Sequence, residues 1–307
     1  MATPASSSIQ VNSFQAFLSK TTPEEVRIHY RIAQPPSQKK GVILLIHGYP
    51  ESSYQFRHVI PLLATAGYKV IAPDYRGHGH SNPPTNSTVD MYTKRQLAAD
   101  LHDLVTKHLD IKEKIHVVGH DIGGMIAHAY VAQFPADTES LIWGECPLPG
   151  STVYEKTKHD PDLWHFDFQS HHPDLAVSLV TGKEELYLTH FYDRLAQKPS
   201  AFTNEDVQTY VRQYSRPGAL RAGFLSYKAF ETDGEDNQTW REKNGKVKVR
   251  NMVLSGEGSF LKGGAESIAR EFYENPVVGL VEGSGHWLAE ENPEGFAKEV
   301  LKFVESG

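Results

Sequence analysis

The stretch that decides the predicted fold is Val117-Val118-Gly119-His120-Asp121-Ile122-Gly123-Gly124-Met125. An apolar run ends at Asp121, and glycines stand two residues before it and two residues after it. This spacing is typical of a strand, one strained turn residue and a helix, because glycines let the strand and helix backbones pass close to the turn. Serine is usual at that turn and indicates acyl transfer, whereas aspartate indicates attack on a saturated carbon through an alkyl-enzyme ester. The simpler alternative is an aspartate that only caps the helix.

Strands and helices alternate on both sides of this motif. Apolar or alternating runs predict eight strands, at residues 9–18, 26–32, 41–46, 68–73, 115–119, 140–144, 249–254 and 277–281. Helical spacing predicts helices at residues 53–66, 94–109, 123–134, 266–273 and 293–304. The alternation predicts an α/β fold with a mostly parallel sheet and helices on both of its faces. Because the strand rhythm stops between residues 149 and 243, we expect a helical cap, or lid, inserted into a core formed by residues 1–148 and 244–307.

Composition and charge exclude several classes of function. A net charge of -7 argues against nucleic-acid binding. The longest apolar runs, such as residues 41–46, are too short to span a membrane. Residues 1–8 lack the pattern of a secretory signal, so we expect a cytoplasmic protein. The sequence leaves a monomer and a homodimer equally open.

Metal binding is not expected either. The single cysteine, Cys146, permits neither an intramolecular disulfide nor a cysteine-based metal site. The pair His171-His172 invites a metal interpretation, but adjacent histidines do not share a helix face, and the spacing of a zinc-binding helix is absent. We interpret this pair as the start of a helix and expect neither a metal nor a cofactor.

Two further motifs predict an oxyanion hole and a base. His47-Gly48-Tyr49-Pro50 follows the strand at residues 41–46, where the loop of such folds donates a backbone N–H to an oxyanion. The second donor is the N–H of the residue after the nucleophile, so we expect Tyr49 and Ile122 to supply the pair. Gly285-His286-Trp287 places a histidine in a tight loop after the last strand, and we predict that His286 is the base.

The acid that orients His286 has two candidates. Glu257 follows the strand at residues 249–254, but the aspartate usual in such a loop would stand two residues later, where the chain has Ser259. Glu145 ends the strand at residues 140–144 and can reach the same histidine from the other side. We favour Glu145 and keep Glu257 as the alternative.

Taken together, the motifs HGYP, GHDIGG and GSGHW and the helical insertion resemble the α/β-hydrolase epoxide hydrolases, over about residues 10–305. The resemblance implies an α/β-hydrolase fold and an enzyme that converts a small-molecule epoxide and water to a vicinal diol. Most members of that family keep the acid after the later strand. A subgroup, together with the related fluoroacetate dehalogenases, keeps the acid after the earlier strand, as Glu145 would.

The resemblance also implies two hydrogen-bond donors in the lid, usually tyrosines, that stabilise the alkoxide of the opened ring. Tyr227, followed by Lys228, matches the second of them. The segment of the first donor contains no tyrosine, and because the subgroup uses histidine there, we predict His165, with Tyr154 as the weaker alternative. We expect four flanking residues to line the substrate site: His47, Trp164, Phe166 and Trp287.

Two rival functions share this set of residues. Haloalkane dehalogenases of this fold usually have a tryptophan after the nucleophile, where this chain has Ile122, and fluoroacetate dehalogenases need arginines near the elbow, which Ile122 and Met125 do not supply. A non-catalytic ligand receptor on the same fold is the other alternative. The presence of Asp121, His286 and Glu145 argues against a receptor.

Overall fold

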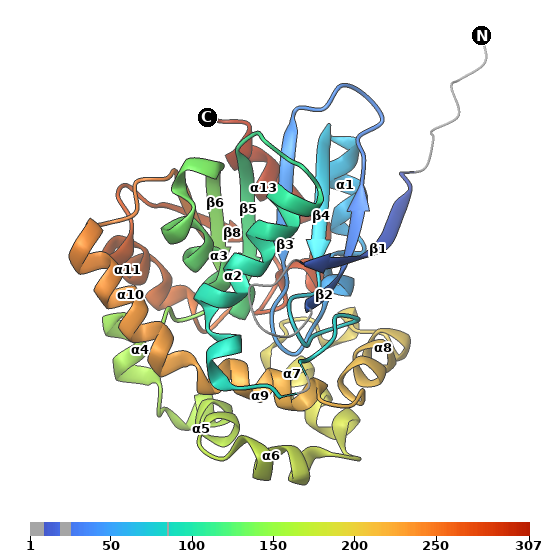
Figure 1. Cartoon of the computed structure of the whole chain (residues 1–307), viewed down its shortest axis with the longest axis vertical. Coiled ribbons are helices and arrows are strands. Elements are labelled where there is room, and N and C mark those ends of the chain that lie inside the picture. The colour runs from blue at the N-terminus through green and yellow to red at the C-terminus, as the bar shows by residue number, and fades with distance from the viewer. Residues whose placement is uncertain (1–8, 19–25, 85) are drawn as a thin grey trace.

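The computed structural model describes residues 9–18, 26–84 and 86–307, and it contains one eight-stranded sheet (Figure 1). The strand order is β1-β2-β4-β3-β5-β6-β7-β8. The strands are β1 (Val11–Leu18), β2 (Val26–Ala33), β3 (Gly41–Ile46), β4 (Tyr68–Pro73), β5 (Ile115–His120), β6 (Thr138–Gly144), β7 (Asn251–Gly256) and β8 (Val277–Val281). Strand β2 pairs antiparallel with β1 and β4, and all the other pairs are parallel. The predicted mostly parallel sheet is confirmed. Residues 1–8 and the connection between the first two predicted strands lie outside the described residues.

Apolar side chains cover the sheet on both faces. Along β3, Val42 and Leu44 belong to one buried cluster, and Ile43 and Leu45 belong to another. Side chains alternate between the faces of a strand, so the continuous apolar run seen in the sequence reflects a strand that is buried on both sides. Helices α2 (Lys94–Asp103) and α3 (Ile122–Gln133) pack on the first face, and α1 (Val59–Thr65) and α13 (Pro293–Val304) pack on the second.

Two expected helices are interrupted. In place of one helix at residues 53–66, the chain forms a short 3-10 turn at Ser53–Phe56, whose N-cap is Ser52, and then α1. The helix expected at residues 94–109 ends as α2 at Asp103 and continues as a wider turn in which the Leu109 N–H reaches back five residues to the Leu104 carbonyl. The remaining core helices are α11 (Lys262–Phe272) and α12 (Leu288–Glu291).

The connection from β6 to β7 contains seven α-helices, which we call the lid helices. They are α4 (Thr152–Thr157), α5 (Trp164–Ser170), α6 (Pro173–Val180), α7 (Glu184–Leu195), α8 (Asn204–Tyr214), α9 (Ala219–Lys228) and α10 (Phe230–Asn244). Figure 1 shows α5 to α9 gathered beyond one end of the sheet. A buried ion pair of 2.7 Å between Lys94 on α2 and Asp233 on α10 ties them to the core. The division of the chain into a core and a lid stays a prediction.

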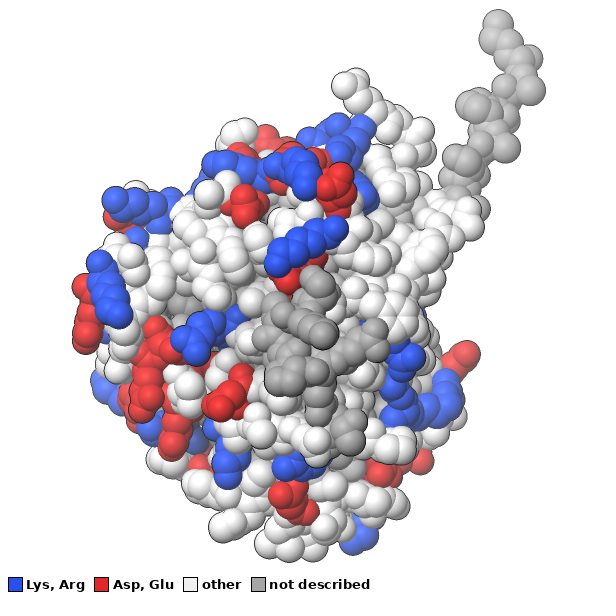
Figure 2. Space-filling model, in the orientation of Figure 1, with Lys and Arg blue, Asp and Glu red and all other residues white. Residues whose placement is uncertain are grey.

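The surface carries charges of both signs. On the face shown in Figure 2, Lys and Arg side chains are interspersed with Asp and Glu side chains. Among the described residues, no helix is both long and apolar enough to cross a membrane. The same part of the chain contains no cluster of three or more His, Cys, Asp or Glu side chains that could hold a metal ion.

Candidate active site

The elbow at Asp121 has the strained geometry that its sequence predicts. Asp121 lies between β5 and α3 with φ 54° and ψ -127°, a conformation that side-chain-bearing residues rarely adopt. A Cβ atom on Gly119 would lie 2.1 Å from the Gly123 carbonyl oxygen, and one on Gly123 would lie 2.2 Å from the Ile46 carbonyl oxygen. Both positions therefore require glycine, and the close packing of strand and helix holds Asp121 in its strained turn.

The Asp121 carboxylate faces a histidine. Within the described residues its side chain makes no capping hydrogen bond to α3, so the simpler alternative of a helix cap does not describe it. Oδ2 of Asp121 lies 3.8 Å from Nε2 of His286, and Nδ1 of His286 lies 3.0 Å from Oε2 of Glu145. His286 is almost fully buried, whereas the Asp121 side chain is 15% exposed. The histidine thus lies between the two carboxylates, of which only the one at the elbow is partly exposed.

Glu145 occupies the place predicted for the acid. It follows β6 directly, its φ is 58°, and its side chain is buried. Oε1 accepts the N–H of Gly256 at 2.9 Å, and Oε2 accepts the Ser259 hydroxyl at 2.6 Å as well as facing His286. The alternative, Glu257, is exposed, and its Oε2 accepts the N–H of Gly283. The structure brings Glu145 to His286 and leaves Glu257 on the surface.

One of the two predicted oxyanion donors contacts the Asp121 carboxylate, and the other begins the helix that follows it. Tyr49 follows β3 in a loop with a cis bond to Pro50, and its N–H donates to Oδ1 of Asp121 at 2.8 Å. Ile122 is the first residue of α3, where backbone N–H groups point out of the helix end. A backbone donor therefore already holds the oxygen that would become the carbonyl oxygen of an ester.

The two predicted lid donors lie together. His165 comes from α5 and Tyr227 from α9, both are buried, and their ring centroids are 5.7 Å apart. The Tyr227 ring also meets the Tyr49 ring edge-on at 5.2 Å, which places the pair beside the loop that contacts Asp121. The alternative donor, Tyr154, packs against Phe166 and Phe230 instead.

Burial keeps both lid donors uncharged. Burial, together with the negative charge of Asp121, raises the pKa of Tyr227 well above its usual value. Burial, together with the nearby Arg194 and His286, lowers the pKa of His165 to about 3. Nδ1 of His165 is buried and has no hydrogen-bond partner among the described residues. At neutral pH the pair therefore offers a phenol O–H and a neutral imidazole.

The four residues expected to line the substrate site fall into two groups. Phe166 contacts the rings of both His165 and Tyr227, at 4.8 and 5.6 Å, and Trp164 contacts His165 at 6.0 Å. Trp287 meets the His286 ring edge-on at 4.5 Å and is fully buried. These three residues surround the candidate reacting groups.

His47 differs from the other three expected lining residues. Its ring is fully buried and stacks on Tyr75 at 4.2 Å, and Nδ1 lies 2.8 Å from the Gly48 carbonyl oxygen. Burial lowers the pKa of His47 to about 4. These contacts are those of a side chain that supports the loop, and its contact with substrate stays a prediction.

Comparisons with known proteins place the chain in a family. The family model of the alpha/beta hydrolase fold matches residues 41–142. The chain is 34% identical over 266 residues to the soluble epoxide hydrolase of Corynebacterium sp. (strain C12), a match that covers 85% of this chain and 89% of that protein. The chain belongs to the epoxide hydrolase-like family of α/β hydrolases.

Solved structures agree with this assignment. Cfl2 from Burkholderia cenocepacia has a TM-score of 0.86 at 28% identity, over 95% of both chains. The epoxide hydrolase CorEH, solved without ligand, has a TM-score of 0.80 at 28% identity, over 97% of this chain and 99% of that one. The predicted resemblance is confirmed for the family, and the subgroup with an early acid stays a prediction.

Two buried polar contacts of this epoxide hydrolase-like site were not predicted from the sequence. The first is Ser259, which donates to Glu145 from the position where an aspartate was expected. The sequence signal was the serine itself, because a hydroxyl at that position can donate a hydrogen bond to a carboxylate from the neighbouring strand.

The second contact is the pair Glu51 and His120, which lies under the site. Nδ1 of His120 lies 3.4 Å from Oε2 of Glu51, and Nε2 lies 2.7 Å from the His286 carbonyl oxygen. Burial lowers the pKa of His120, but the nearby carboxylate of Glu51 outweighs this effect and raises the pKa to about 9. A charged His120 therefore holds the backbone of the catalytic candidate His286.

Proposed function

We propose that this chain hydrolyses epoxides to vicinal diols through an ester of Asp121. The observation that carries the proposal is a carboxylate, rather than a hydroxyl, at the strained elbow, 3.8 Å from the ring of a histidine that is itself paired with Glu145. A carboxylate that attacks a saturated carbon forms an ester, which then needs an activated water. The similarity to the soluble epoxide hydrolase of Corynebacterium supports an epoxide as the substrate.

The first half-reaction is ring opening. Oδ2 of Asp121 attacks one carbon of the epoxide, the bond from that carbon to the ring oxygen breaks, and the electron pair stays on the ring oxygen. His165 and Tyr227 donate hydrogen bonds to that oxygen, and one of them supplies the proton that completes the hydroxyl group. The neutral state of both groups and the unpartnered Nδ1 of His165 support this role.

The second half-reaction is ester hydrolysis. His286, oriented by Glu145, takes a proton from water, and the water oxygen attacks the carbonyl carbon of the Asp121 ester. Negative charge develops on Oδ1, where the N–H groups of Tyr49 and Ile122 stabilise it. The intermediate then collapses, and the alkoxy oxygen takes the proton from His286 and leaves as part of the diol. The Asp121 carboxylic acid that forms loses the remaining water proton, which replaces the proton given up by the lid donor, so that both the carboxylate and the donor are restored.

The lid and the early acid are part of the same proposal. We infer that residues 149–243 close over the nucleophile as a lid and supply both ring-opening donors. We also infer that Glu145, rather than Glu257, is the acid, which assigns the chain to the subgroup with an acid after β6. The hydrogen bonds from Gly256 and Ser259 to Glu145 support this assignment.

Oxygen labelling tests the ester mechanism directly. In a single turnover of styrene oxide in heavy-oxygen water, the diol should contain no label, because the oxygen it gains comes from Asp121. The label should appear in the peptide that contains Asp121. Label in the first diol would mean direct attack by water and would overturn the proposal.

Trapping and substrate choice complete the test. His286→Gln should let the ester accumulate, visible as an added substrate mass on the peptide that contains Asp121, and Asp121→Asn is the matched control that cannot form it. A panel of haloalkanes and haloacetates should release no halide. Halide release without diol formation would instead indicate a dehalogenase, and tight binding of epoxides without turnover would indicate a receptor.

A further inference from the structure

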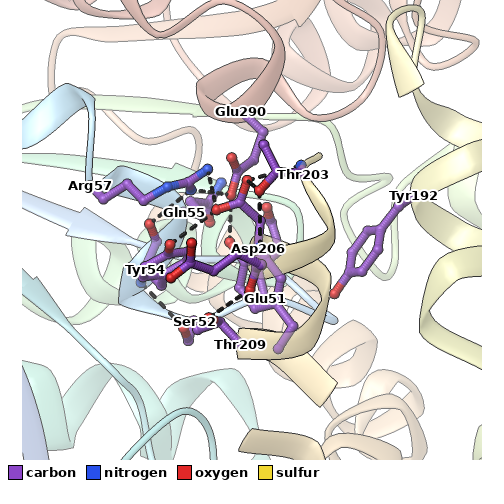
Figure 3. Close-up of polar contacts among 12 residues, drawn as sticks. Glu51, Ser52, Tyr54, Gln55, Arg57, Tyr192, Thr203, Asp206, Thr209 and Glu290 are labelled. Atoms are coloured by element: carbon purple, nitrogen blue, oxygen red, sulfur yellow. Dashed lines mark hydrogen bonds and ion pairs between the residues drawn. The ribbon is translucent and has the colours of Figure 1, made fainter. Parts of the chain in front are cut away.

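Two lid tyrosines hold the loop that contains the oxyanion donor. The Tyr192 hydroxyl, from α7, donates to the Pro50 carbonyl at 2.7 Å, and the Tyr214 hydroxyl, from the end of α8, donates to the Glu51 carbonyl at 3.1 Å. Figure 3 shows Tyr192 pointing toward the segment of Glu51 and Ser52. Both tyrosines are buried, and burial raises the pKa of each well above its usual value. Both therefore remain donors at neutral pH.

The two carbonyls belong to the residues that directly follow Tyr49. The Tyr49 N–H donates to Oδ1 of Asp121, and the N–H one residue earlier, on Gly48, donates to Gln55 Oε1 at 3.1 Å. The core thus holds the loop on one side of Tyr49, and the lid holds it on the other side. A loop with buried peptide groups keeps its geometry only while those groups have partners.

We propose that Tyr192 and Tyr214 are positioning residues that fix the Tyr49 N–H against Oδ1 of Asp121 and thereby set the rate of ester hydrolysis rather than of ring opening. The inference rests on the proposed function, because it assumes that an ester of Asp121 forms.

The charge on Oδ1 explains why only one half-reaction depends on these tyrosines. Oδ1 bears about half a negative charge in the free carboxylate, less in the ester, and a full charge in the tetrahedral intermediate. A donor contributes to a rate when it binds the transition state more tightly than the ground state. A loosened Tyr49 N–H therefore slows ester hydrolysis, in which the charge grows, and does not slow ring opening, in which the charge falls.

A simpler role would be to fasten the lid to the core, and a third tyrosine provides the control. Tyr210, also on α8, donates to Oε1 of Glu290 at 2.6 Å, and Arg57 bonds the same oxygen at 2.7 Å. Figure 3 shows Glu290 and Arg57 in the network that joins them to Asp206 of the lid. Tyr210→Phe removes a buried bond between lid and core without touching the loop after Tyr49.

The experiment compares Tyr192→Phe, Tyr214→Phe and the double variant with Tyr210→Phe in full-length enzyme. Rapid-quench mass spectrometry with styrene oxide measures formation and decay of the Asp121 ester well below the melting temperature. In the double variant we expect decay to slow about tenfold, less than the 10²–10³-fold loss seen when an oxyanion donor is removed outright. Formation should stay unchanged, so the ester should accumulate. In Tyr210→Phe only the melting temperature should fall.

Three outcomes would contradict the inference. If formation and decay of the ester slowed equally in the double variant, Tyr192 and Tyr214 would only attach the lid to the core. The same conclusion would follow if Tyr210→Phe slowed ester decay as much as the double variant does. Unchanged rates of formation and decay in the double variant would mean that the loop keeps its geometry without them. If wild-type enzyme and His286→Gln form no ester at all, the proposed function itself fails, which separates that failure from the failure of this inference.

Discussion

The sheet edge and the lid hold their candidate reacting groups in different ways. At the sheet edge, Glu145 accepts from a backbone N–H and from a hydroxyl, and Asp121 accepts from a backbone N–H. In the lid, His165 and Tyr227 are surrounded by aromatic rings, and Nδ1 of His165 is buried without a partner among the described residues. An unpartnered buried polar group costs about 1–3 kcal/mol.

The difference follows from when each region bears charge. The carboxylates already have hydrogen-bond donors in the free protein. In the proposed mechanism, the neutral lid groups meet negative charge only when the epoxide ring opens. We infer that the sheet edge is organised in advance, whereas the lid leaves its hydrogen-bonding capacity for the substrate.

The largest expected effect is at the elbow. Asp121→Asn should lower turnover by more than about 10⁴-fold, because an amide is a poor nucleophile and removal of one member of a triad typically costs that much. Asparagine can keep the hydrogen bond from the Tyr49 N–H, so the melting temperature should change little. Steady-state diol formation and a thermal melt check both points, and residual activity above one part in a thousand would be inconsistent with a nucleophilic Asp121.

A slightly smaller effect distinguishes the two acids. Glu145→Gln should lower turnover by about 10³–10⁴-fold, because an amide cannot hold His286 in the orientation and charge state that the carboxylate favours. Glu257→Gln, on the surface, should stay within about twofold of wild type. The matched pair is measured as kcat on one epoxide. A larger loss from Glu257→Gln would reverse the assignment.

Substitutions of the lid donors should slow ring opening rather than ester hydrolysis. Tyr227→Phe keeps the ring contacts and removes one donor, so ring opening should slow by on the order of 10²-fold while ester hydrolysis stays unchanged. This is the reverse of the result expected for Tyr192 and Tyr214. His165→Phe should behave like Tyr227→Phe, and Tyr154→Phe is the control. Ester formation in single turnover is the measurement, and a greater loss from Tyr154→Phe would exchange the roles of His165 and Tyr154.

The last effect concerns stability and pH rather than a reaction rate. The pKa of His165 is about 3 in the folded chain and near 6.5 when unfolded, so below pH 6.5 the unfolded state binds a proton that the folded state does not. His165 therefore lowers the free energy of unfolding as the pH falls from about 6.5 toward 3, by up to about 1.4 kcal/mol per pH unit. His165→Phe should make this decline shallower in denaturant titrations. Replacement of the exposed His171 by Gln should leave it unchanged.

His120 should have the opposite dependence on pH. Its pKa is raised to about 9, so its contribution to stability is complete below pH 6.5 and is lost as the pH rises through 9. The lid histidine thus lowers the free energy of unfolding at acidic pH, and the core histidine lowers it at alkaline pH. If the contributions of His165 and His120 to the free energy of unfolding were lost in the same direction of pH, the charge states inferred for the two regions would be wrong.

Sequence motifs predicted the sheet edge well because they depend on contacts between residues that are close together in the chain. Gly119 is needed for its close contact with Gly123 inside the elbow, and the apolar run of β3 predicts a strand buried on both faces. The two interrupted helices were predicted less well. Helical spacing in a sequence does not reveal where a 3-10 turn such as Ser53–Phe56, or a wider turn such as that at Leu104, interrupts the hydrogen-bond ladder.

By itself, the sequence determined the α/β fold, the aspartate elbow, the loop of Tyr49 and the histidine after the last strand, because each depends on residues close together in the chain. Only the tertiary structure decided which glutamate meets His286, since Glu145 lies 141 residues away from it. The same holds for the support that Ser259, Tyr192 and Tyr214 provide. Such contacts join distant segments, and their geometry arises only when the sheet and the lid helices pack together.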